Sequence, residues 1–254
     1  MTISRRQSLK TIGLALSVSG LSAAAHAVTA IAPGARALEA LTAKLASSPR
    51  RRDFKTLPMV LEHRDQWDAE ALDTVLRYPA GPKQCWDTTD IAGPWLNVMR
   101  NAINAQVWSF HHPDFLCVSA THGSAQLALY DDAMWEKYGL AKNAGGNIAR
   151  NRFAAAPPDA GTDPKDFQNP TGAYSSHATG ILPLQQRGVV FLACHNAVWE
   201  LSDRLIAAGT NPDKLTIDRL CAELTNHLIP GVIMTPGSVG TVVELAKAGF
   251  SYAR

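Results

Sequence analysis

The chain has 254 residues, of which 46% are hydrophobic and 18% are charged, and its formal net charge is +2 at pH 7. This length suits one large domain or two small ones, and the apolar share is enough for a full core. The small charge argues against a nucleic-acid-binding protein, because such proteins carry a clustered basic surface.

Residues 1–27 are predicted to be an export signal. Arg5 and Arg6 precede an apolar stretch, and Ala25-His26-Ala27 has the small-x-small pattern of a cleavage site. The paired arginines are typical of a twin-arginine signal and predict a periplasmic protein, with a secretory signal or a retained anchor as the alternatives. Cleavage removes three of the cations and changes the net charge from +2 to −1, so no acidic partner is implied. No later segment has 18 uncharged apolar residues, so we expect no membrane span after signal removal.

The rest of the chain is predicted to consist of an N-terminal extension and linker at 28–56 and a single domain at 57–254. The spacing of apolar residues and the turn residues between them place the elements of the first half. In chain order they are a helix at 35–46, a strand at 57–61, helices at 68–76 and 95–107, a strand at 115–120 and a helix at 133–138.

Residues 141–180 interrupt this pattern and are predicted to be an insertion. They are rich in glycine and proline and contain few large apolar residues. A loop of this length inside a compact domain is often functional, and a mobile surface insertion is the alternative. If the insertion covers a site, Tyr174 and His177 near its end line the pocket as substrate-binding residues.

The second half begins with the most informative feature of the chain, a short apolar run from Val189 to Ala193 that ends at Cys194. Such a run fits a strand that is covered on both faces. Helices are expected around 198–208, 216–228 and 239–246, with a last strand at 231–234. The alternation of strands and helices predicts an α/β fold, a parallel sheet with helices on both faces.

The C-terminal block resembles the DsrE/DsrF-like sulfur-relay family. The resemblance is carried by the strand that ends in Cys194, by the strand at 231–234 with Thr235-Pro236-Gly237, and by the ending Gly249-Phe250-Ser251-Tyr252. Upstream, Val118-Ser119-Ala120-Thr121-His122-Gly123 is similar to the family's strand that ends in His-Gly. The resemblance implies a flavodoxin-like three-layer fold, a homo-oligomer that is often a trimer, and a persulfide-accepting cysteine at Cys194.

Three residues are predicted to be catalytic: Cys194, His122 and His195. A thiolate at the carboxyl end of a strand is stabilised by the N–H groups of the next helix and by an imidazolium. His195 is adjacent in sequence, whereas His122 ends a strand that meets the same edge of the sheet. A buried, inert cysteine is the alternative.

Asn196 and Gly123 complete the predicted substrate-binding set, Asn196 with an alternative role as helix cap and Gly123 as a turn residue. Cys221 and Cys117 are predicted to lie in the core. Cys85 is placed in a loop, where it is able to resolve an oxidised Cys194 or form a disulfide; four cysteines allow three pairings. No metal site and no cofactor are expected, because Cys-x-x-Cys and phosphate-binding glycine patterns are absent from the sequence.

Two functions remain open from the sequence. In the first, the protein is a sulfurtransferase-like enzyme or a sulfur carrier, with Cys194 attacking a small sulfur-containing substrate or a partner protein thiol. In the second, the same edge of the sheet binds a small molecule or a metal without catalysis, or the chain is a structural subunit of an exported redox complex.

Overall fold

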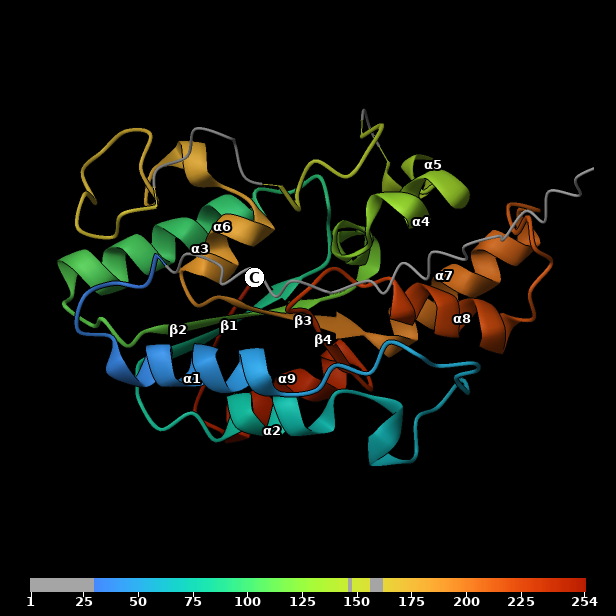
Figure 1. Ribbon diagram of the computed structural model, residues 1–254, viewed down its shortest axis with the longest axis horizontal. Coiled ribbons are helices and arrows are strands. Elements are labelled where there is room, and N and C mark those ends of the chain that lie inside the picture. Colours follow the sequence, from blue (N-terminus) through green and yellow to red (C-terminus); the bar gives the residue numbers. More distant parts are fainter. Residues whose placement is uncertain (1–29, 146–147, 156–161) are drawn as a thin grey trace, which may run out of the picture.

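A five-stranded parallel sheet forms the centre of the computed structural model, which describes residues 30–145, 148–155 and 162–254. The strand order across the sheet is β4-β3-β2-β1-β5. This confirms the predicted α/β class and the three-layer arrangement (Figure 1). The strands are β1 (Lys83–Thr88), β2 (Leu116–Thr121), β3 (Val190–Cys194), β4 (Ile233–Thr235) and β5 (Ser251–Ala253).

One face of the sheet is covered by three helices, which lie below it in Figure 1. They are α1 (Arg36–Ser47), α2 (Ala69–Leu76) and α9 (Ser238–Lys247), and a 3₁₀ turn, η1 (Arg64–Gln66), precedes α2. Leu38 and Leu41 of α1, Leu245 of α9 and Leu192 of β3 belong to one continuous apolar cluster between these helices and the sheet. The segment before residue 57 therefore contributes a helix to the packed layer.

The opposite face carries a larger apolar cluster under the remaining helices, which lie above the sheet in Figure 1. Trp95 at the start of α3 packs edge-on against Phe191 of β3, with 6.1 Å between ring centroids. The elements on this side are α3 (Trp95–Asn104) with its π-helical extension η2 (Ala105–Ser109), η3 (Gly123–Leu129), α4 (Asp132–Lys137), α5 (Ala141–Ala144), η4 (Ser176–Ala178), α6 (Ile181–Gln186), α7 (His195–Ala207) and α8 (Ile217–Asn226).

The helix ends follow local chemistry. The Asp131 side chain accepts the Met134 N–H at 3.0 Å and caps α4, as the aspartate before that helix predicts. The helix predicted at 216–228 is α8, which begins one residue later, at Ile217, and ends at Asn226. The last helix extends from Ser238 to Lys247. Among the described residues, no helix has both the length and the apolar character that a bilayer crossing requires.

The chain reverses direction across the sheet between β1 and β5. From β1 to β4 each strand lies beside its predecessor, with connections over one face, and α9 then returns over the other face to β5 at the far side of β1. In open parallel sheets, ligands and reacting groups gather beyond the carboxyl ends of the strands, above all at such a reversal. The carboxyl ends of β1, β2, β3 and β5 are therefore where a site is expected.

The strand predicted at 57–61 is wrong, because this segment lies against α8 as an irregular stretch. The Leu57 N–H bonds to the Asp218 carbonyl at 3.0 Å, and Met59 and Val60 are exposed. The first strand is β1, and the prediction of a loop at Cys85 is wrong because this residue lies within that strand. Cys85 is instead buried in the sheet, and the polar neighbours that obscured the strand are tolerated because β5 beside it is only three residues long.

Candidate functional site

Four chain segments bring polar side chains together at the carboxyl edge of the sheet, on the face covered by α9. Thr121 of β2 is paired with Ala193 of β3, and continuing that register places His122 beside Cys194. Asp87 lies near the end of β1, and Tyr252 lies in β5. Across this edge the order is therefore Cys194, His122, Asp87 and Tyr252.

The sulfur of Cys194 is buried at the edge but has a polar partner. The residue is 4% exposed, and its Sγ accepts the backbone N–H of Ser238 at 3.2 Å. Ser238 is the first residue of α9, and Cys194 itself directly precedes α7. Two helix N-termini thus meet at this thiol. The Ser238 N–H at the start of α9 carries partial positive charge and bonds to the sulfur, whereas the Cys194 side chain accepts no hydrogen bond from the first turn of α7.

Side chains of the neighbouring elements fix this arrangement. The Cys194 N–H bonds to Oε1 of Gln126 at 3.0 Å, and the Ser238 hydroxyl donates to the Thr121 carbonyl at 3.1 Å. The Thr235 hydroxyl donates to the Ala193 carbonyl at 2.8 Å. All of these partners are buried. Hydrogen bonds from η3 and β4 therefore hold the backbone at Cys194 and Ala193, and the Ser238 hydroxyl joins the start of α9 to β2.

His122, Asp87 and Tyr252 form a continuous hydrogen-bonded chain. Nε2 of His122 lies 2.7 Å from Oδ1 of Asp87, and the Tyr252 hydroxyl donates to Oδ2 of the same carboxylate at 2.7 Å. Burial disfavours the charged carboxylate, but the hydrogen bonds from His122 and Tyr252 outweigh it and lower the pKa of Asp87 below its ordinary value. An ionised carboxylate only accepts, so Nε2 of His122 carries the hydrogen and Nδ1 is left to exchange a proton.

His195 lies in a different environment from Cys194. Its side chain is fully buried, Nε2 donates to the Pro58 carbonyl at 2.8 Å, and Nδ1 lies 3.8 Å from Sγ of Cys221 on α8. Burial lowers the pKa of His195, and hydrogen bonds to the backbone at Pro58 and Met59 offset only part of this effect. The imidazole therefore joins α7 to the segment before α2 and to α8.

Asn196 and Gly123 both lie at the carboxyl edge. Asn196 is in the first turn of α7 and does not cap it, because the residue before the helix is Cys194. Its side-chain amide packs on Gly237, where an added Cβ would lie 2.9 Å from Nδ2. Gly123 has a φ of +56°, and a Cβ there would lie 2.6 Å from the Thr89 carbonyl. Only glycine accommodates this close turn after His122.

Tyr174 lies at the opposite edge of the sheet. Its hydroxyl donates to the Ala30 carbonyl at 2.9 Å, and the guanidinium of Arg187 stacks over its ring at 4.1 Å from the centroid. Arg187 precedes β3, at the amino end of the strand whose carboxyl end is Cys194. His177, in η4, is exposed, and its backbone N–H bonds to the Ser175 hydroxyl at 3.2 Å. The end of the insertion is thus held on α3, where Arg100 and Asn104 both donate to the Tyr174 carbonyl, whereas Asn151 in its earlier part donates to the Ala128 carbonyl of η3.

The four cysteines are all free and buried, and the sulfur of Cys194 accepts the Ser238 N–H from the first residue of a helix. Burial raises the pKa of Cys85 to about 12, with a further contribution from Asp87. Burial likewise raises the pKa of Cys221 to about 12, and it raises the pKa of Cys117 still further. Thiolate formation at these three positions is therefore strongly disfavoured. Within the described ranges, no group of three or more metal-binding side chains converges.

Sequence reasoning missed four residues of this site. Asp87 lies on β1, a strand that the sequence pattern does not predict. Tyr252 lies on β5, and the sequence indicates it only as part of the family-like ending of the C-terminal block. Ser238 acts through its backbone and Gln126 through an amide that reaches across from η3, and neither role has a signal in the sequence. An aspartate at the end of β1 is the one feature that a correct strand assignment would have revealed.

The fold and this edge define the class of protein: a three-layer α/β protein with a parallel sheet and a buried cysteine where two helices begin. Comparisons with protein-family models, curated proteins and solved structures give no match to the chain.

Proposed function

We propose that this protein handles sulfane sulfur or thiols through Cys194, as a sulfurtransferase-like enzyme or a persulfide carrier. The observation that carries the proposal is the Ser238 N–H, which points at the Cys194 sulfur from the start of α9. A hydrogen bond from a helix N-terminus favours the thiolate, which is the nucleophilic form of cysteine. The resemblance to sulfur-relay proteins in the segment ending at Cys194 supports the same role.

The proposed step is attack of the Cys194 thiolate on the sulfane sulfur of a donor such as thiosulfate. A bond forms between Sγ and the sulfane sulfur, and the bond from that sulfur to the donor's sulfonate group breaks. Its electron pair leaves with sulfite, and a Cys194 persulfide anion remains. For release, an acceptor thiolate attacks the outer sulfur of the persulfide and forms a new sulfur–sulfur bond. The bond from that sulfur to Sγ breaks, and its electron pair returns to Cys194 as the thiolate.

The chain of His122, Asp87 and Tyr252 is proposed to serve this step by managing a proton. Asp87 holds the imidazole of His122 through Nε2, so Nδ1 is the nitrogen that takes the proton of a thiol at the neighbouring strand end. In the structure, Nε2 of His122 bonds to Asp87, and the backbone N–H of His122 donates to the Thr88 carbonyl. Because Cys194 is 4% exposed, a donor reaches it when the turn before α9 shifts.

The proposed setting is the periplasm, reached through the twin-arginine-type signal, whose residues lie outside the described ranges. Self-association, with a trimer favoured by the resemblance, is part of the proposal. It is supported by Val239 and Val243, which lie one turn apart on α9 and are both exposed.

The test is incubation of the purified protein with thiosulfate, followed by intact-mass measurement. We expect a gain of one sulfur atom that dithiothreitol removes and that Cys194→Ser abolishes. Cys221→Ser is the matched control, because it removes another buried thiol, and it should keep the gain. His122→Asn should slow the gain about tenfold or more, as loss of a general base does.

Two results would overturn the proposal. The first is the absence of any sulfur gain in the wild-type protein with either thiosulfate or polysulfide. The second is a gain that persists in Cys194→Ser, since the sulfur would then reside on another residue.

A further inference from the structure

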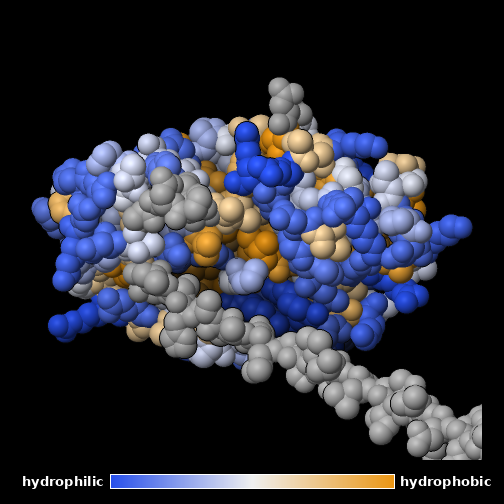
Figure 2. All heavy atoms as spheres, turned by 45° about the horizontal axis from the view of Figure 1, so that its top comes forward, coloured by the Kyte–Doolittle hydropathy of each residue, from blue (hydrophilic) through white to orange (hydrophobic). Residues whose placement is uncertain are grey.

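A cavity of about 270 Å³ lies at the start of α3, on the face of the sheet opposite to the sulfur of Cys194. One part of its wall is the first turn of α3 with the two residues before it, namely Gly93, Pro94, Trp95, Leu96 and Asn97. The other part comes from the insertion, namely Arg152, Phe153 and Thr179. Figure 2 shows a hollow with apolar side chains in the middle of the α3 and α6 side of the molecule, surrounded by polar residues. Pockets for drug-sized ligands start at about 300 Å³, so this one suits a smaller molecule.

One side of the cavity offers unpaired N–H groups. Pro94 precedes α3 and provides no capping side chain, and the first turn of the helix contains no acidic residue. Val98 is the first residue of α3 whose backbone N–H has an acceptor, the Pro94 carbonyl. The N–H groups of Trp95, Leu96 and Asn97 have none among residues 30–145, 148–155 and 162–254. Asp90, the nearest preceding acid, caps the Ala92 N–H and does not line the cavity.

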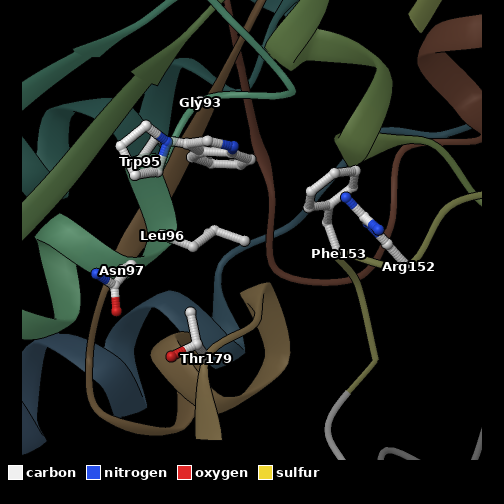
Figure 3. Close-up of a pocket in the computed structure, with 8 residues that line it drawn as sticks. Gly93, Trp95, Leu96, Asn97, Arg152, Phe153 and Thr179 are labelled. Carbon is white, nitrogen blue, oxygen red and sulfur yellow. The ribbon is translucent and has the colours of Figure 1, made fainter. Parts of the chain in front are cut away.

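The other side of the cavity carries a cation. Arg152 lies beside the ring of Phe153, with 5.5 Å from its Cζ to the ring centroid. In the described part of the chain, its guanidinium has neither an acidic partner nor a hydrogen bond. Figure 3 shows the Phe153 ring facing Trp95 and Leu96 across the cavity, with Arg152 beside that ring and Thr179 at the bottom of the view. A guanidinium opposite a helix N-terminus favours a bound anion.

Two buried polar atoms in the same wall also have no partner. Trp95 is 7% exposed and lines the cavity, and its Nε1 has no acceptor among the described residues. The Thr179 hydroxyl is likewise unpaired. Buried tryptophan and threonine side chains normally find hydrogen-bond partners, so these two atoms indicate a site that is completed by a ligand. The Trp95 and Phe153 rings pack on each other, with 6.4 Å between their centroids, so the apolar part of such a ligand would lie against this ring pair.

We propose that this cavity binds a small organic acid, with the carboxylate between Arg152 and the first turn of α3 and an apolar body against Trp95 and Phe153. Bidentate pairing with a guanidinium selects a planar carboxylate, and the aromatic walls select an acid with an apolar part over a bare inorganic anion. The site is independent of Cys194 and goes beyond the proposed sulfur chemistry.

The experiment is isothermal titration of the full protein with benzoate, with benzamide as the neutral isostere. We expect saturable benzoate binding with a Kd of about 1 mM or tighter, and benzamide binding at least about tenfold weaker. Arg152→Gln should weaken benzoate binding about tenfold or more. Arg150→Gln is the matched control, because it removes the same charge two residues away at an exposed position outside the cavity, and its Kd should stay within about twofold.

The proposal is overturned if benzoate does not bind saturably, if benzamide binds equally well, or if Arg152→Gln and Arg150→Gln bind alike. It is also overturned if sulfate displaces benzoate at equal concentration, since the site would then take inorganic oxyanions. Circular dichroism establishes that each variant is folded. Cys194→Ser should bind benzoate as the wild type does, so the outcome is separate from that of the sulfur-transfer test.

Discussion

His122 and His195 follow neighbouring strands of one sheet, yet their imidazoles lie in two different kinds of surroundings. His122 is partly exposed and bonds to a carboxylate that a tyrosine also holds. His195 is fully buried and bonds to a backbone carbonyl and a thiol. The residue adjacent to Cys194 in sequence is thus turned into the core, whereas the residue adjacent in the strand register shares its edge. In a parallel sheet, register across strands brings side chains together more reliably than adjacency along the chain.

The largest expected difference between the two histidines is in folding stability. His195→Ala removes a buried ring and leaves the Pro58 carbonyl without its donor, so the free energy of unfolding should fall by about 2–4 kcal/mol. His122→Ala removes a partly exposed ring and should cost about 1 kcal/mol or less. Urea denaturation of the two variants measures both values, and equal losses would contradict the contrast.

The next effect is a pH dependence that belongs to His195. Its pKa is lowered by burial, so near pH 6 the unfolded chain binds a proton that the folded protein does not. The contribution of His195 to the free energy of unfolding should therefore be fully present above pH 6.5. It should fall as the pH drops towards the pKa of His195 in the folded protein, by at most about 1.4 kcal/mol per pH unit. In His195→Gln this loss should be absent. Denaturation curves at several pH values between 7 and 5 that run parallel for the two proteins would refute the prediction.

The smallest effect is expected at the His122 end of the comparison. Tyr252→Phe removes one of the two side-chain hydrogen bonds that hold the Asp87 carboxylate, so the pKa of Asp87 should rise. An NMR titration of the carboxyl carbon measures this change. The fold should be unaffected, because the Tyr252 ring is 56% exposed. An unchanged or lower Asp87 pKa would show that the tyrosine does not help to hold the charge.

Much of the fold follows from the sequence because its core elements have clear periodicity. The apolar spacing in α3 and α8 and the apolar runs of β2 and β3 predict these elements within a few residues. β1 could not be predicted in the same way, because Lys83, Gln84 and Asp87 make it read as a polar loop. Its place in the sheet comes from pairing with β2 and β5, which is a tertiary effect.

The candidate site was predictable to a lesser extent. Cys194 and His122 stand out because each ends an apolar strand, and parallel strands share their carboxyl edge. The position of the insertion on the fold was not predictable from the sequence. Its described part is held by contacts between individual side chains that follow no sequence pattern, such as the stacking of Arg187 on Tyr174. The cavity beside α3 also had no signal, because Arg152 and Trp95 are more than fifty residues apart and neither belongs to a motif.

The short strand β5 has a practical consequence for work on this protein. It consists of three residues paired only with β1, and its central residue is Tyr252. Deletion of residues 251–254 would remove this strand while the other four strands of the sheet kept their pairing with one another. Such a variant should therefore look folded by spectroscopy, yet lack the tyrosine hydroxyl that holds Asp87.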